Sequence, residues 1–351
     1  MTARRRTRRE GERGRRERVA EGAAPPGPGP DARRGRVVAH HGVAVLVRFD
    51  DGEERQVWLA ASQSAVVGDR VAVEGERLFV EPAHGVLRRR DARGRERTIA
   101  VNLDHLGIVV AVEPREPPGY VDRGIVIARA AGIEPFLVLN KVDLPGGDEL
   151  AARLREIYDD SVPVLAVSAE ARTGLEAIDA AIGPGELAAF VGPSGVGKSS
   201  LLNALVPDLA LVVGALNRGS GRGRHTTTTA TLHTLPGGGV LVDTAGFRDF
   251  IAVDVTPLDA ARHFPGFEAA LEAGCRFRDC LHRTEPDCGV LAAVAEGAIP
   301  EARHRAYCAL LEELLAVAES ASSGGSGRSA SRSSSAPGAV RGADRARRSD
   351  K

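Results

Sequence analysis

The order of two loop motifs restricts the fold of this chain more than its other features do. Residues 136–145, FLVLNKVDLP, have the pattern of a loop that reads guanine. Residues 191–200, VGPSGVGKSS, match the G-x-x-x-x-G-K-[ST] pattern of a phosphate-holding loop. In the familiar GTP-binding fold the phosphate loop comes first along the chain. Here the base loop precedes it by about fifty residues, so the fold must bring the two loops together in reversed order.

Apolar runs alternate with helical patterns around both motifs. The runs at 106–112, 135–140, 163–169 and 186–192 are continuously apolar, which is typical of parallel strands buried on both faces. Patterns such as DELAARLREIYDD and GLEAIDAAIG lie between them and predict helices. We therefore expect an α/β fold, a doubly wound sheet that binds ligands at the carboxyl ends of its strands.

The phosphate loop has the context that its pattern requires, between an apolar run and the helical sequence KSSLLNALV. Its backbone N–H groups can cradle phosphates, Lys198 can reach the β- and γ-phosphates, and Ser199 can bind Mg²⁺. Asp243, at the end of a later apolar run, can hold Mg²⁺ through water, and the amide of Gly246 can meet the γ-phosphate. The predicted phosphate-binding residues are Gly192, Pro193, Ser194, Gly195, Val196, Gly197, Lys198, Ser199, Ser200, Asp243 and Gly246.

Guanine recognition is predicted at Asn140, Lys141 and Asp143. The Asp143 carboxylate can accept hydrogen bonds from guanine N1–H and the 2-amino group, a pair of donors that adenine does not offer. Asn140 would brace the loop and approach the base edge, while the stem of Lys141 packs on the face of the base. Ser168-Ala169, after the next apolar run, would supply a backbone donor to guanine O6. An ordinary strand-to-helix turn is the alternative interpretation of this loop.

Lysine usage supports both loops. Only three of the 47 basic residues are lysine, and Lys141 and Lys198 are the two that lie away from the end of the chain. In a chain that otherwise uses arginine for positive charge, these positions indicate sites where a compact ammonium fits and a planar guanidinium does not.

The loop GRGRHTTTTATL, residues 221–232, lies where a first switch is expected. A hydroxyl of Thr226, Thr227 or Thr228 would complete the Mg²⁺ shell, and we select Thr227. Phe247 follows Gly246, at a position where ordinary GTPases often carry a water-orienting Gln, so slow intrinsic hydrolysis is expected. His225 is the nearest polar candidate for that task, although a histidine in such a loop is usually only solvated.

A Cys-x4-Cys-x-His-x5-Cys constellation follows in CRFRDCLHRTEPDC. Three thiolates and one imidazole within a short segment suit a closed tetrahedral Zn²⁺ site with a structural role. The predicted ligands are Cys275, Cys280, His282 and Cys288. Separate buried thiols are the alternative, and Cys308, on a helical run, is expected in the core.

Charge is uneven along the chain although the formal net charge is zero. Residues 1–18 carry nine Arg against three Glu, and residues 328–351 carry six Arg and one Lys against two Asp. Such basic ends suggest arms that contact a polyanion such as RNA, or simply disordered solubilising ends. Short alternating runs from 36 to about 82 predict a small β-barrel or sandwich.

These patterns predict five segments. They are a disordered basic arm (1–35), a β-barrel (36–92), a nucleotide-binding domain (93–256), a helical zinc-binding domain (257–318) and a disordered Ser/Gly/Arg tail (319–351). No stretch of 18 apolar residues predicts a membrane span, the N-terminus lacks the apolar region of a secretory signal, and four Cys fit a reducing compartment. We expect a cytoplasmic monomer.

In this order, the β unit, the reversed nucleotide motifs and the Cys-Cys-His-Cys site resemble the RsgA (YjeQ) family of circularly permuted GTPases. The resemblance covers about residues 36–318 and is carried by NKVD, GPSGVGKSS, GRHTTT, CRFRDCLH with EP before the last Cys, and the strand VNLDHLGIVVAV with Asn102 and Asp104. A doubly wound sheet has its ends close together, so cutting and rejoining the chain leaves the pocket intact. DTAGF in place of the commoner DSPG-type sequence and the long basic ends depart from the family pattern.

The resemblance implies an OB-fold at the N-terminus and hydrolysis of GTP to GDP and phosphate, stimulated by the 30S subunit. It also implies a role in late maturation of that subunit with contacts to 16S rRNA, and that His225 helps to position the attacking water. Two alternatives stay open at this point: an RNA-binding assembly factor latched by GTP with incidental hydrolysis, and a permuted GTPase that serves the large subunit.

Overall fold

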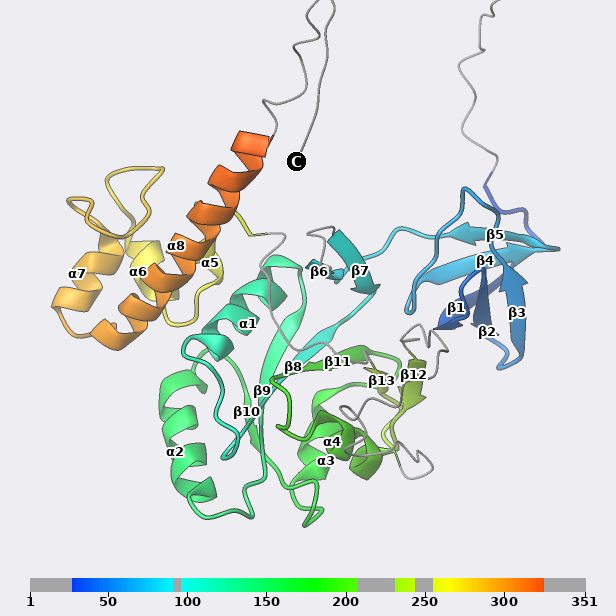
Figure 1. Cartoon of the computed structure of the whole chain (residues 1–351), viewed down its shortest axis with the longest axis horizontal. Coiled ribbons are helices and arrows are strands. Elements are labelled where there is room, and N and C mark those ends of the chain that lie inside the picture. The colour runs from blue at the N-terminus through cyan, green and yellow to red at the C-terminus, as the bar shows by residue number, and fades with distance from the viewer. Residues whose placement is uncertain (1–26, 91–95, 207–230, 244–254, 325–351) are drawn as a thin grey trace, which may run out of the picture.

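The computed structural model of the chain describes residues 27–90, 96–206, 231–243 and 255–324. Figure 1 shows a β-rich N-terminal part, a central sheet covered by helices and a C-terminal helical part. Within the described residues, no helix combines the length and the apolar character needed to cross a membrane.

The N-terminal part contains five antiparallel strands in the spatial order β3-β2-β1-β4-β5. They are β1 (Arg33–His40), β2 (Ala44–Phe49), β3 (Glu54–Trp58), β4 (Arg70–Glu74) and β5 (Arg77–Val80). Alternate residues point inward and form a separate core that includes Val37, Val45, Val47, Phe49 and Val71. β1 begins at Arg33, inside the segment predicted as an arm, because Arg33 pairs with Val73 of β4.

A short hairpin, β6 (Leu87–Arg90) and β7 (Glu96–Ala100), connects this part to the central sheet. The central strands are β8 (His105–Ala111), β9 (Glu134–Asn140), β10 (Val164–Ala166), β11 (Leu187–Val191), β12 (Thr231–Thr234) and β13 (Val240–Asp243). They lie in the order β10-β9-β8-β11-β13-β12, and all neighbours are parallel except β13 and β12. Strand β10 covers only Val164–Ala166, so it is shorter than the strand predicted at 163–169.

Helices cover both faces of the central sheet. They are α1 (Tyr120–Ala130), α2 (Gly147–Tyr158), α3 (Leu175–Ala181) and α4 (Lys198–Leu205). Ile108 and Val110 of β8 belong to the core with α1, whereas Val109 and Ala111 belong to the core with α3 and α4. Because both faces are buried, the strand is apolar from Leu106 to Ala111, as predicted.

The C-terminal part consists of α5 (Ala260–His263), α6 (Glu268–Ala273), α7 (Gly289–Ala295) and α8 (Glu301–Gly324). The rings of Phe264, Phe267 and Tyr307 form its centre, with centroids 4.8 to 5.3 Å apart. Helix α8 extends into the segment predicted as a tail.

A buried polar cluster joins this part to the central sheet. Arg303 of α8 donates to the carbonyls of Pro265 (3.0 Å) and Ile157 (2.7 Å), and its guanidinium lies 4.7 Å from the ring centroid of Tyr158. The Tyr158 hydroxyl donates to Asp122 (3.0 Å). Burial raises the pKa of Asp122, and Arg303 and the hydrogen bond from Tyr158 only partly oppose this effect.

The N-terminal β-rich part also joins the central sheet directly. Ala39 of β1 pairs with Thr231 of β12, and Thr231 pairs in turn with Asp243 of β13. A continuous hydrogen-bonded sheet therefore runs from the N-terminal strands to β13, which ends at Asp243.

Candidate functional site

The predicted nucleotide residues follow the carboxyl ends of adjacent strands. Asn140 ends β9, Ser168 follows β10, Gly192 follows β11 and Asp243 ends β13. Because these strands are parallel, the loops lie at one edge of the sheet, where doubly wound folds bind ligands.

The phosphate loop needs glycine at its turn into helix α4. Gly197 has φ +97°, and a Cβ atom there would lie 2.3 Å from Nδ2 of Asn140. Only glycine satisfies both restrictions at low energy. The loop ends at Lys198, the first residue of α4, whose ammonium donates to the carbonyls of Gly192 (2.6 Å) and Pro193 (2.9 Å). The lysine side chain therefore lies across the start of the loop.

Asn140 joins the base loop to the phosphate loop. Its side chain is 1% exposed; Nδ2 donates to the carbonyl of Val196 (2.9 Å), and Oδ1 accepts from the amide of Ala169 (3.1 Å). These partners determine the orientation of the amide, because one contact needs a donor and the other an acceptor. One side chain thus connects the three predicted loops.

Lys141 adds a second link between the same loops. Its ammonium donates to the carbonyls of Gly195 (2.7 Å) and Glu113 (2.8 Å), the latter in the loop after β8. The role of the Glu113 carbonyl was not predicted, because no sequence pattern marks a backbone acceptor in a neighbouring loop. Asp143 is exposed and accepts a hydrogen bond from the hydroxyl of buried Ser168.

The expected magnesium ligands are described only in part. Ser199 lies in the first turn of α4, and Asp243 lies at the end of the strand next to β11. Burial raises the pKa of Asp243, and the nearby His233 opposes that rise. His225, Thr227 and Gly246 lie outside the described residues, so their predicted roles stay predictions. Ser194 and Ser200, also predicted, lie in the loop and in the first turn of α4.

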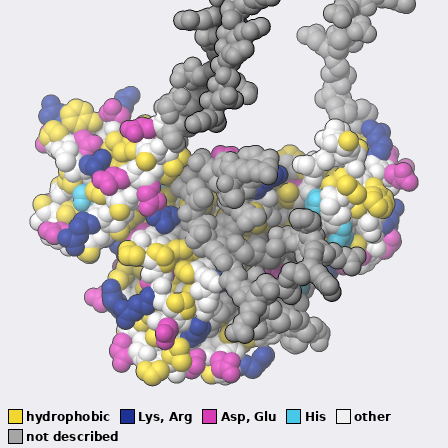
Figure 2. Space-filling view, in the orientation of Figure 1, with side chains coloured by type: hydrophobic (Ala, Val, Ile, Leu, Met, Phe, Trp, Pro, Cys, Tyr) yellow, Lys and Arg dark blue, Asp and Glu magenta, His cyan; other side chains and the backbone are white. Residues whose placement is uncertain are grey.

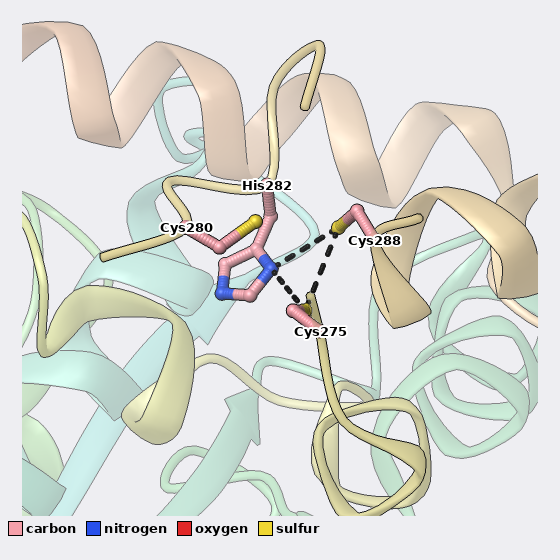
Figure 3. A group of neighbouring side chains, drawn as sticks. All are labelled: Cys275, Cys280, His282 and Cys288. Atoms are coloured by element: carbon pink, nitrogen blue, oxygen red, sulfur yellow. Dashed lines mark hydrogen bonds between the residues drawn. The ribbon is translucent and has the colours of Figure 1, made fainter. Parts of the chain in front are cut away.

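The four predicted metal ligands converge in the C-terminal part (Figure 3). Cys275, Cys280, His282 and Cys288 each offer one ligand atom, and these atoms all lie within 4.8 Å of one another. The Cys275 and Cys288 sulfurs are 3.8 Å apart, and Nδ1 of His282 lies 3.5 Å and 3.3 Å from them. Cys308 is not part of this group.

Burial shifts the pKa values of two of these candidate ligands, Cys280 and His282. Burial raises the pKa of the Cys280 thiol to about 12, and the neighbouring Cys288 and Cys275 sulfurs contribute to the rise. Burial lowers the pKa of His282, so its ring is neutral, the form that binds metals. Without a cation the raised pKa would keep the Cys280 thiol protonated, whereas a bound cation would stabilise its thiolate.

Residues around the cluster hold its loop in place. The Glu285 carboxylate accepts backbone hydrogen bonds from Leu281 (2.9 Å), Arg283 (2.7 Å) and Thr284 (3.0 Å). The Tyr307 hydroxyl donates to the carbonyl of Leu281 (3.0 Å). In the sequence, the Glu-Pro pair before the last Cys pointed to the role of Glu285, whereas no pattern pointed to that of Tyr307.

Comparison with known proteins places the chain in a family. The model of the RsgA GTPase family matches residues 80–252. The chain is 41% identical over 299 residues to the small ribosomal subunit biogenesis GTPase RsgA of Chromohalobacter salexigens, covering 82% of this chain and 87% of that protein. The RsgA of Azotobacter vinelandii is also 41% identical, with the same coverage. The chain belongs to the RsgA family of GTPases.

Two solved structures share the fold of this chain. The crystal structure of YjeQ from Thermotoga maritima superposes with a TM-score of 0.66 at 33% identity, covering 81% of this chain and 99% of that one. YloQ, described as a circularly permuted GTPase, superposes with a TM-score of 0.63 at 24% identity, covering 82% and 96% of the two chains. The predicted family and the permuted GTPase fold are confirmed: β8, β9 and β10 precede β11 in the chain but lie beside it in one sheet.

Proposed function

We propose that this chain hydrolyses GTP to GDP and phosphate while it is bound to the maturing small ribosomal subunit, late in the assembly of that particle. The relatives that cover most of its length are named for small-subunit biogenesis. The observation that carries the nucleotide part of the proposal is Asn140, which connects a loop of guanine-reading pattern to a loop of phosphate-binding pattern.

The nucleotide would bind with its base at Asp143 and its phosphates at the N-terminus of α4. Lys198 already lies beside the loop carbonyls, and an incoming phosphate would offer its ammonium a stronger, charged acceptor. The hydrogen bond from Ser168 holds Asp143 in place, which leaves carboxylate lone pairs for guanine donors. The amide of Ala169 already donates to Oδ1 of Asn140. If it also donates to guanine O6, its hydrogen bond would be divided between these two acceptors.

Magnesium would bind with the nucleotide. The hydroxyl of Ser199 and the carboxylate of Asp243 are oxygen ligands of the type that Mg²⁺ prefers, and they come from neighbouring strand ends. Its chemistry is to neutralise charge that develops on the phosphates. By family resemblance, Thr227 would complete the metal shell and His225 would orient the attacking water.

Zinc is the cation that we propose for the cysteine-histidine cluster. Tetrahedral coordination with Zn–S bonds of about 2.3 Å requires sulfurs about 3.8 Å apart. The Cys275–Cys288 separation of 3.8 Å fits this value. With all four positions taken by protein ligands, the ion would stabilise the loop between α6 and α7 rather than take part in catalysis.

The proposal extends to the domains and partners. The strand order β3-β2-β1-β4-β5 supports an OB-fold-like barrel over residues 36–92, followed by GTPase (93–256) and zinc-binding (257–318) domains. OB-folds commonly bind oligonucleotides, so the barrel is a candidate contact for 16S rRNA. We expect the chain to act as a cytoplasmic monomer on the 30S subunit.

A phosphate-release assay with purified ribosomal subunits tests this function. We expect 30S subunits to stimulate hydrolysis strongly, and 50S subunits to have little effect. Stimulation by 50S subunits alone would contradict the small-subunit assignment. Tight binding of GTP to the chain on 30S subunits without stimulation would instead favour a latch in which hydrolysis is incidental.

A further inference from the structure

The hairpin at residues 168–173 carries the amide that we expect to meet guanine O6. Ser168 and Thr173 pair as an antiparallel bridge, with hydrogen bonds of 3.0 Å and 3.1 Å between their backbone groups. The Ser168 hydroxyl also accepts from the amide of Ala171 (2.9 Å), which closes the turn between them. These bonds stiffen the hairpin itself, but they do not determine where it lies relative to the phosphate loop.

Two contacts connect this hairpin to the segment that would bind phosphates. The first runs through Asn140, which accepts from the amide of Ala169 and donates to the carbonyl of Val196, just before α4. The second is made by Arg172, whose guanidinium donates to the carbonyl of Ala204 (3.0 Å) in the last turn of α4. The hairpin is thus held near both ends of this helix.

The Ala204 carbonyl can accept from Arg172 because α4 ends one residue later. The helix ends at Leu205, and Val206 has extended backbone dihedral angles. Carbonyls in the last turn of a helix lack a helical donor, and a cation there is also favoured by the negative end of the helix dipole. Arg172 therefore makes a charge-assisted hydrogen bond at a position that suits it.

The backbone of Arg172 is a second sign that its side chain is used. Its φ of +55° lies in the left-handed region, where residues other than glycine are uncommon. Basic and acidic side chains are interspersed over the described surface that faces the viewer in Figure 2, so positive charge alone does not distinguish a residue of this chain. Arg172 is distinguished by an uncommon backbone conformation together with a contact that joins two separate elements.

Two separate anchors determine the orientation of the hairpin as well as its position. The carbonyl that Arg172 contacts lies about 9 Å along the helix axis from Lys198, where α4 begins. A body held at one point can rotate about it, whereas a second point at this distance restricts the rotation. Rotation of the hairpin would move the Ala169 amide, and a hydrogen bond weakens steeply as its angle departs from linearity.

We propose that Arg172 is a positioning residue for guanine recognition. By donating to Ala204, it holds the Ala169 amide at the place, relative to the phosphate helix, where the 6-oxo group of a bound guanine lies. This inference rests on the proposed function, in which Ala169 donates to guanine O6, and it adds a residue that acts through Ala169 without contacting the nucleotide.

Titration of the full-length chain with GDP and two analogues tests the proposal. 6-Thio-GDP replaces the 6-oxo oxygen by a larger sulfur that is a weaker acceptor, and inosine diphosphate lacks only the 2-amino group. Arg172→Ala should bind GDP about tenfold more weakly, with a much smaller loss for 6-thio-GDP. The preference for GDP over 6-thio-GDP should therefore fall severalfold, while the preference for GDP over inosine diphosphate stays unchanged.

Three further variants separate positioning from stability. Arg172→Lys keeps a cationic donor and should restore most of the preference for GDP. Arg172→Gly removes the side chain at a positive φ that glycine adopts easily, so it should fold and show the same change of preference as Arg172→Ala. Arg55→Ala is the matched control, because Arg55 also donates to a backbone carbonyl, that of Gly75 (3.2 Å), but in the N-terminal β-rich part. It should leave all three affinities unchanged.

The outcomes distinguish this inference from the proposed function. Equal losses for the three nucleotides in Arg172→Ala would show a purely structural role and would overturn this inference alone. Wild-type affinity for GDP in Arg172→Gly would overturn it too. If the wild type binds 6-thio-GDP as tightly as GDP, the contact between Ala169 and guanine O6 is wrong, and the base-reading part of the proposed function fails together with this inference.

Discussion

Replacement of Asn140 tests the central geometrical claim, that one buried amide holds the base loop against the phosphate loop. Asn140→Ala removes the donor to the Val196 carbonyl and the acceptor of the Ala169 amide. Leaving a buried partner unpaired costs about 1–3 kcal/mol. Val196 is fully buried and Ala169 half-buried, so we take about 3 kcal/mol for the two together. If the loops of the variant regain their wild-type arrangement only when nucleotide binds, this free energy is lost from binding. The affinity for the nucleotide then falls more than about a hundredfold.

The assay is titration with a fluorescent GDP analogue, combined with urea unfolding of the free protein. Asn102→Ala is a matched control. Asn102 is also buried (4% exposed); it donates to the Gly68 carbonyl (3.0 Å) and accepts from the His84 amide (3.2 Å), at the junction with the N-terminal β-rich part. It should lose a similar amount of stability and keep its nucleotide affinity.

Asn140→Asp sharpens the test because it keeps the acceptor for Ala169 and places an oxygen against the carbonyl of Val196. Binding should therefore be weak at neutral pH and improve as the pH falls, because a protonated carboxyl can donate to Val196. Affinity of Asn140→Ala within threefold of wild type, or an equal loss in Asn102→Ala, would refute the reasoning.

Three further variants test other parts of the site. Asp143→Asn should shift base preference from guanine toward xanthine in competition binding, since an amide can offer a donor to the 2-oxo group; unchanged selectivity for GTP contradicts base reading by Asp143. Cys280→Ser should lower the zinc content below one ion per chain and the melting temperature of the C-terminal part, with GDP affinity unchanged; full zinc content would argue against the tetrahedral site. For Asp122, burial raises the folded pKa above its usual value of 3.8, so its contribution to stability declines as the pH rises through that raised value. Asp122→Asn should remove this decline and give a flatter stability–pH curve above pH 4 in urea unfolding; an unchanged curve would mean that Asp122 does not titrate in this range.

The loops were predictable because their chemistry is local. Gly197 must adopt a positive φ at the start of a helix, and four soft ligands within one short segment can close on a single ion with little rearrangement of the chain. The reversed order of the motifs also indicated the permutation. The same arrangement of strands in a sheet can be built from a chain whose segments follow one another in a different order.

The remaining features depend on contacts between distant residues. The apolar run at 163–169 does not show that only Val164–Ala166 pairs as a strand. Nothing local to Arg303 shows that it meets Asp122 and Tyr158. Such facts follow from which surfaces meet when the parts pack.

The amino-acid sequence alone thus indicated the family, the two loops of nucleotide-binding pattern and the cysteine-histidine cluster, because each is encoded in residues close together in the chain. Only the tertiary structure decided that Asn140 connects three loops and that the N-terminal strands join the central sheet through Ala39, Thr231 and Asp243. The physical reason is that hydrogen bonds and burial between separate segments depend on the positions of both partners, and a local pattern describes only one of them.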